Sequence, residues 1–269
     1  MKCGQQELKI KSAMNIGLKL WSSNLNYIEE AKKLYIRGIF DYLELFVEQN
    51  SSSCISEWKS CDIPIVLHAP HSHKGLNLSL KEAYADNGRA IDAVEAYAVE
   101  LLPRFIIFHP GVDGDLGETI RQIQVFKRSY WRVFENALIE NKPKTGLNGE
   151  RCMGSSPDEI QTLTKETGLG FCLDIGHAIV SAAARNQWWK ELVESFLGLQ
   201  PKMFHLSDGD MHSERDMHLH LGQGNFDIDT IVRLIEGPGC MMSLETPKTN
   251  PEDLDDFLED INYLKAILR

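Results

Sequence analysis

The chain has 269 residues, of which 43% are hydrophobic and 25% are charged, as in an ordinary globular protein. Its formal net charge of −11 excludes the overall basic surface of a typical nucleic-acid-binding protein, although bound divalent cations would offset acidic side chains locally and a small basic face is compatible with it. No apolar stretch approaches membrane-spanning length, and the first residues lack the apolar core of a secretory signal, so we expect a soluble, cytoplasmic protein with no membrane partner.

Strand-like and helix-like segments alternate along the whole chain. Short apolar runs predict strands, and longer segments with apolar residues three or four apart predict helices. The predicted strands are 14–20, 42–47, 64–70, 104–111, 137–141, 170–177, 202–208 and 240–247. The predicted helices are 24–38, 54–60, 80–102, 120–134, one that begins within 155–160, one that contains residues 188–189, 227–236 and 251–268.

Two Glu-Asn pairs compete to end the fifth strand, Glu135-Asn136 and Glu140-Asn141. The helical period of the preceding segment continues to about Phe134, which places Glu135 on a helix. We therefore assign the strand to 137–141, with Glu140 at its end.

Eight strand–helix units in succession predict a parallel sheet that closes into a single (β/α)₈ barrel over residues 1–269. No low-complexity linker interrupts this pattern. The connection 206–226 is long for a loop between a strand and a helix, and long loops in compact domains are usually functional.

Histidines and carboxylates recur where the predicted strands end. Because the carboxyl ends of all strands meet at one face of such a barrel, these side chains predict a multinuclear metal site there. Imidazole and carboxylate suit zinc best, with manganese as an alternative. The candidate metal ligands are His68, His109, Glu140, Asp174, His177, His205, Asp216, His218 and Glu245.

Several candidates also have a structural interpretation. A hydrogen-bonded core position would explain His68, and helix N-capping would explain Asp174. Asp216 and His218 would belong to a solvated loop if that segment does not fold back onto the barrel. The recurrence at many strand ends favours metal binding over these separate explanations.

Other residues are candidates for catalysis and substrate binding. Glu140 and Glu245 face each other across the eight-strand order, so each is a candidate ion bridge or general base. Lys142 and Lys144 would bind a substrate phosphate or simply be exposed, and Trp21 would stack on a base or sugar or only pack.

Three further polar residues are not expected to bind metal. We expect Asp208 to cap or orient the ligand His205. We expect His71 and His73 to be exposed loop histidines.

The motifs that carry these residues resemble the superfamily that joins endonuclease IV (apurinic/apyrimidinic endonuclease family 2) with xylose-isomerase-like sugar isomerases and epimerases. The similar segments are HAPHSHKGLNL, FHPG, LIEN, LDIGHA, HLSD, DMHLHLGQG and LETP, which cover nearly the whole chain. The resemblance implies up to three zinc ions. One would be held by His68, His109 and Glu140, a second by Glu140, Asp174, His205 and Glu245, and a third by His177, Asp216 and His218.

The resemblance leaves two enzymatic functions open. Endonuclease IV chemistry implies a metal-dependent hydrolase for abasic-site DNA in DNA repair. The single-metal epimerases share Glu140, Asp174, His205 and Glu245, and commonly His177, which implies an isomerase for a sugar or sugar phosphate. A metal-binding barrel without catalysis is a third hypothesis.

The chain departs from endonuclease IV in two segments. GLKLWSS replaces the Gly-x-His-Val-Ser pattern at the first strand, and His71-Ser72-His73-Lys74 stands where a DNA-intercalating tyrosine would be expected. These departures bear on recognition of abasic sites and leave the metal ligands intact.

Overall fold

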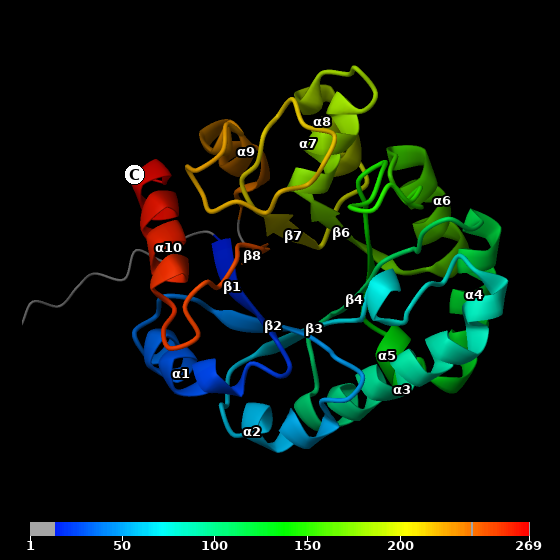
Figure 1. Ribbon diagram of the computed structural model, residues 1–269, viewed down its shortest axis with the longest axis horizontal. Helices are drawn as coiled ribbons and strands as arrows, with labels where there is room; N and C mark the ends of the chain where they lie inside the picture. The colour runs from blue at the N-terminus through cyan, green and yellow to red at the C-terminus, as the bar shows by residue number, and fades with distance from the viewer. Residues whose placement is uncertain (1–13, 238, 269) are drawn as a thin grey trace, which may run out of the picture.

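The computed structural model describes residues 14–237 and 239–268, which form a closed barrel of eight parallel strands surrounded by helices (Figure 1). Strands that follow one another in the sequence are adjacent in the sheet, and β1 pairs with β8 to close the barrel. The strands are β1 Met14–Trp21, β2 Tyr42–Phe46, β3 Ile65–His68, β4 Ile106–Phe108, β5 Ala137–Glu140, β6 Gly170–Asp174, β7 Met203–Leu206 and β8 Cys240–Leu244. The predicted (β/α)₈ fold is confirmed. The first 13 residues of the predicted 1–269 domain lie outside the described residues.

The helices form a ring around the barrel (Figure 1). They are α1 Ile28–Ile36, α2 Ile55–Lys59, α3 Tyr84–Leu101, α4 Leu116–Ser129, α5 Trp131–Phe134, α6 Pro157–Thr167, α7 Ile175–Ala183, α8 Trp189–Leu197, α9 Ile228–Ile235 and α10 Asp255–Ile267. Short 3₁₀ turns are η1 Leu25–Tyr27, η2 Ser52–Cys54, η3 Ser72–Lys74 and η4 Lys81–Ala83. Among the described residues, no helix is both long and apolar enough to cross a bilayer.

Local signals explain several boundaries and correct others. Ser156 caps α6 by accepting a hydrogen bond from the Glu159 amide, with proline next in the chain, so the helix begins within the predicted range 155–160. The predicted single helix ending near residue 134 is divided at Tyr130, whose backbone is not helical. The predicted strand 170–177 was too long, because Asp174 caps α7 by accepting from the His177 amide and the helix starts at once.

The interior of the barrel is filled by one layer of apolar side chains, one from each of seven strands. They are Tyr42, Val66, Ile107, Leu138, Cys172, Met203 and Met241. β1 contributes Gly17, where a Cβ atom would lie 2.4 Å from the Tyr42 ring, so glycine makes room for that tyrosine. The remaining core lies between the strands and the helices.

Candidate metal centre

A polar layer lies on top of the apolar layer inside the barrel. Alternate residues of a strand point to the same side, so the residue two positions after each apolar one also faces inward. These residues are Glu44, His68, His109, Glu140, Asp174, His205 and Ser243, and β1 places Lys19 two residues after Gly17. The fold thus brings candidate ligands from β3, β4, β5, β6 and β7 to one level of the barrel.

The first group consists of His68, His109 and Glu140, whose donor atoms lie within 4.8 Å of one another. Glu140 Oε2 is 3.0 Å from His68 Nε2 and 3.2 Å from His109 Nε2. The other His68 nitrogen, Nδ1, lies 2.9 Å from the Ala69 carbonyl oxygen, which orients the ring with Nε2 toward the carboxylate.

The second group consists of Glu140, Asp174, His205 and Glu245, again within 4.8 Å. His205 Nδ1 lies 2.6 Å from Glu245 Oε1 and 3.4 Å from Glu140 Oε2. Glu140 therefore belongs to both groups, as the family resemblance implies.

The third group is formed by Asp174, His177 and His218. Asp216 joins the two histidines, since its Oδ2 is 3.2 Å from His177 Nε2 and 2.9 Å from His218 Nδ1. The segment with Asp216 and His218 folds back onto the barrel, which contradicts the solvated-loop interpretation. Asp174 both caps α7 and lies in this group, so its two interpretations are compatible.

Asp208 holds the long loop in place. Its buried carboxylate accepts hydrogen bonds from the backbone amides of Gly209, Gly222, Gly224 and Phe226. The backbone of Asp208 also pairs with Leu219 in both directions, at 2.9 and 2.8 Å. Asp208 thus positions the loop that carries Asp216 and His218, whereas the sequence predicted that it would cap or orient His205.

Burial and charge set opposing pKa shifts among these side chains. Burial alone would raise the pKa of Glu140, but His109 and His205 hold it well below its usual value. Burial and the charge of Lys142 hold the pKa of His109 well below its usual value. Burial raises the pKa of Asp174 to about 6, despite the nearby His177. The pKa values of the candidate ligands are therefore shifted in both directions, although the donor atoms within each group lie within 4.8 Å of one another.

Three buried atoms of the candidate ligands, His109 Nδ1, Glu140 Oε1 and His205 Nδ1, make no well-directed hydrogen bond among the described residues. Buried polar atoms are normally hydrogen-bonded, so such atoms inside a cluster of imidazoles and carboxylates fit a cation. The donor set therefore suits zinc or manganese.

A cavity of about 550 Å³ opens above the polar layer. Trp21 and Lys142 line it, together with all the candidate metal ligands except Asp174 and His205. The Lys142 ammonium makes no hydrogen bond or ion pair within the described part of the chain. Lys144 is turned away from the cavity and donates to the Ala184 carbonyl oxygen at 3.0 Å.

The loop histidines differ from each other. His73 is exposed, as predicted, and pairs with Glu150 at 2.7 Å. The expectation of an exposed His71 is wrong, because its ring packs against Phe46 and His109 at the cavity wall. Burial, followed by the charge of Lys142, lowers the pKa of His71 to about 3.

Lys19 and Glu44 were missed by the sequence reasoning. Both stand inside predicted strands rather than at their ends, so neither matched the strand-end pattern. Counting two residues on from Gly17 and Tyr42 would have placed them in the polar layer.

The parallel barrel, with histidines and carboxylates gathered where its strands end, defines a TIM barrel with a candidate metal centre. The chain belongs to the family of xylose isomerase-like TIM barrels, whose model matches residues 53–267. It is 25% identical over 263 residues to the uncharacterized protein MJ1614 of Methanocaldococcus jannaschii, covering 92% of this chain and 93% of that one. It is 24% identical over 209 residues to the probable endonuclease 4 of Mycobacterium tuberculosis, covering 75% of this chain and 80% of that one.

Two solved structures share the fold across almost their whole length. A D-tagatose 3-epimerase-like protein gives a TM-score of 0.69 at 20% identity, covering 95% of this chain and 97% of that one. Endonuclease IV from Thermus thermophilus gives a TM-score of 0.68 at 21% identity, covering 94% of this chain and 99% of that one. Proteins named as endonucleases and as epimerases are thus both similar to this chain, so the comparisons establish the superfamily and not the reaction.

Proposed function

We propose that this protein is a metal-dependent phosphodiesterase resembling endonuclease IV, with abasic-site DNA as its substrate. The observation that supports this function best is the convergence of all nine predicted ligands into three adjoining groups. A single-metal isomerase requires only Glu140, Asp174, His205 and Glu245. Asp216 and His218, on the long loop held by Asp208, would not be needed as metal ligands in that case.

The residues take distinct roles in this proposal. Zinc in the three groups would supply Lewis-acid polarisation of a phosphate oxygen and would lower the pKa of the attacking water. Glu140 holds the first two groups together, and Glu245 orients the nucleophile. Lys142 neutralises phosphate charge with its free ammonium, and Trp21, which is 42% exposed, offers a face for a sugar or base.

Incision of DNA tests the proposal. We expect the zinc- or manganese-loaded protein to cut a duplex at a single abasic site and to leave the same duplex intact when that site carries a normal base. The variant Asp216→Asn should slow incision, because it removes a charged donor from the third group. Absence of incision at micromolar enzyme, with metal confirmed bound by elemental analysis, would contradict the proposal.

The cavity favours a second candidate, a sugar or sugar-phosphate isomerase. A volume of about 550 Å³ lies within the range of small-molecule sites, and an acidic chain is poorly suited to bind DNA. Glu140 and Glu245 would then move the proton between neighbouring carbons, and Lys142 would bind a phosphate. Incorporation of solvent deuterium at sugar C2 or C3 would support this candidate. About one metal per chain would favour it, and about three would favour phosphate chemistry.

Metal binding should release protons near neutral pH. Burial alone would lower the pKa of His177, but the Asp174 carboxylate and hydrogen bonds to Asp216 and Glu140 raise it to about 9. Burial also opposes the charged form of His205, yet nearby Cys172, Glu245 and Glu44 raise its pKa well above the usual value. Because both pKa values are raised and a ligand imidazole must be neutral, we expect both imidazoles to give up a proton when metal binds.

We accordingly expect zinc affinity to increase from pH 6 to about pH 9 and then level off. Calorimetric titrations at pH 7 in two buffers of different protonation enthalpy should show more than one proton released per chain. His212→Asn, a change at an exposed loop histidine, should leave this number unchanged. Zinc binding without proton release would show that these pKa shifts are absent.

A further inference from the structure

A buried ion pair on β1 and β2 is unused by the function proposed above. Glu44 has 0% exposed surface inside the barrel, and its neighbour Lys19 is also largely buried. Burying a carboxylate costs several kcal/mol unless charged partners and hydrogen bonds compensate. A leucine would fill such a position at no such cost, so the contacts of Glu44 indicate what it does.

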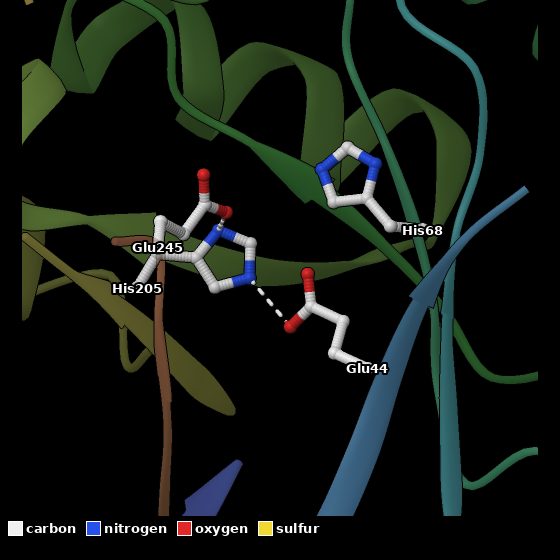
Figure 2. A group of neighbouring side chains, drawn as sticks. All are labelled: Glu44, His68, His205 and Glu245. Carbon is white, nitrogen blue, oxygen red and sulfur yellow. Dashed lines mark hydrogen bonds and ion pairs between the residues drawn. The ribbon is translucent and has the colours of Figure 1, made fainter. Parts of the chain in front are cut away.

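Glu44 contacts the outer nitrogen of a candidate metal ligand. Its Oε2 lies 3.0 Å from His205 Nε2, while the opposite nitrogen, Nδ1, faces Glu245 Oε1 at 2.6 Å. Figure 2 shows the His205 ring between these two carboxylates, with His68 across the cluster. A hydrogen bond at Nε2 therefore fixes which nitrogen is presented to the second metal group.

Lys19 compensates the buried charge of Glu44. Its Nζ lies 3.0 Å from Glu44 Oε1 and also contacts Glu245 Oε1. Burial alone would lower the pKa of Lys19, but the carboxylates of Glu245 and Glu44 raise it. Burial alone would raise the pKa of Glu44, but His205 and Lys19 lower it to about 2. Each Glu44 oxygen thus has one charged partner.

We propose that Glu44 is a positioning residue, which accepts the Nε2 proton of His205 and so holds Nδ1 toward the second metal group, with Lys19 as its counter-ion. This inference rests on the proposed metal-dependent function. A carboxylate behind a ligating histidine fixes the tautomer and ring orientation, and its loss typically costs about 10- to 100-fold in metal affinity or activity.

Three variants separate orientation from charge. Glu44→Leu removes the acceptor and one negative charge. Glu44→Gln keeps an acceptor oxygen without the charge. The double variant Lys19→Met/Glu44→Leu removes the acceptor but restores the charge balance. We expect one zinc dissociation constant to rise about 10- to 100-fold in Glu44→Leu and to stay raised in the double variant. In Glu44→Gln it should rise less.

A second readout does not need metal. In the metal-free protein labelled with ¹⁵N-histidine, the Nε2 proton of His205 should give a downfield, slowly exchanging signal, assigned by its loss in His205→Gln. That signal should disappear in Glu44→Leu and persist in Glu44→Gln. Circular dichroism checks that both variants fold. Should Glu44→Leu fail to fold, an upfield shift of the signal in Glu44→Gln, together with weaker zinc binding, carries the same conclusion.

The outcomes distinguish this inference from the proposed function. A native protein that binds no zinc overturns the function, while the proton signal still tests the Glu44–His205 contact. Zinc binding in the double variant within twofold of native would show that Glu44 acts through charge alone, and would overturn the positioning role. So would a signal that persists in a folded Glu44→Leu protein.

Discussion

Glu140→Gln is expected to abolish metal binding by at least the first two groups. It should also lower kcat/KM by about 10³-fold or more, which corresponds to about 4 kcal/mol of transition-state stabilisation. Glu140 is 1% exposed. Its Oε2 lies 3.0 Å from His68, 3.2 Å from His109 and 3.4 Å from His205. Glutamine keeps the shape but loses the charge, and it puts an amide NH₂ where one carboxylate oxygen faced the imidazoles.

The measurement pairs elemental analysis with steady-state kinetics on whichever substrate the native protein turns over. Glu135→Gln is the matched control, because it makes the same change in the other Glu-Asn pair, at an exposed position outside the centre. We expect that variant to behave like the native protein. A Glu140→Gln protein that retains full metal content and near-native kcat/KM would show that Glu140 does not bridge the groups.

The gathering of the strand-end candidate ligands was predictable because the carboxyl ends of all the strands lie at one face of a parallel barrel. Each apolar run ends where its strand reaches the same face, so a donor such as His68 or Glu140 needs no knowledge of its neighbours to be found. For residues inside a strand, the strand's register determines which side chains point into the barrel. Glu44 is flanked by Leu43 and Leu45, and nothing local shows which face of the strand points into the barrel. Only its position two residues beyond Tyr42 does so.

Other differences from prediction come from tertiary contacts and capping. His71 lies in a polar loop, and its packing depends on Phe46 of β2, 25 residues earlier in the chain. The strand β6 ends at Asp174 because that side chain caps α7 directly, so no connecting loop separates strand from helix. Apolar run length alone cannot show this, since Ile175 continues the apolar pattern of the strand.

Asp208→Ala is expected to have the largest effect on stability among the residues that touch no candidate ligand. Asp208 is 1% exposed, and its carboxylate accepts four backbone amides. Alanine leaves those buried amides without an acceptor, and breaking a buried charged network of this kind costs about 3–5 kcal/mol. The midpoint of thermal unfolding should fall by about 10 °C. Because the freed loop carries Asp216 and His218, the third metal group should be lost as well.

Differential scanning calorimetry on metal-free protein measures the stability effect, and elemental analysis measures the metal effect. Asp210→Ala is the control, since Asp210 belongs to the same loop and is partly exposed, and among the described residues its carboxylate accepts from one backbone amide, that of His212, and from the Asn225 side chain. Its unfolding midpoint and metal content should stay near native. If Asp208→Ala lowers stability but keeps about three metals per chain, the loop does not need this anchor to present its ligands. Loss of one metal, with the other two retained, is the result expected of an anchor that serves only the third group.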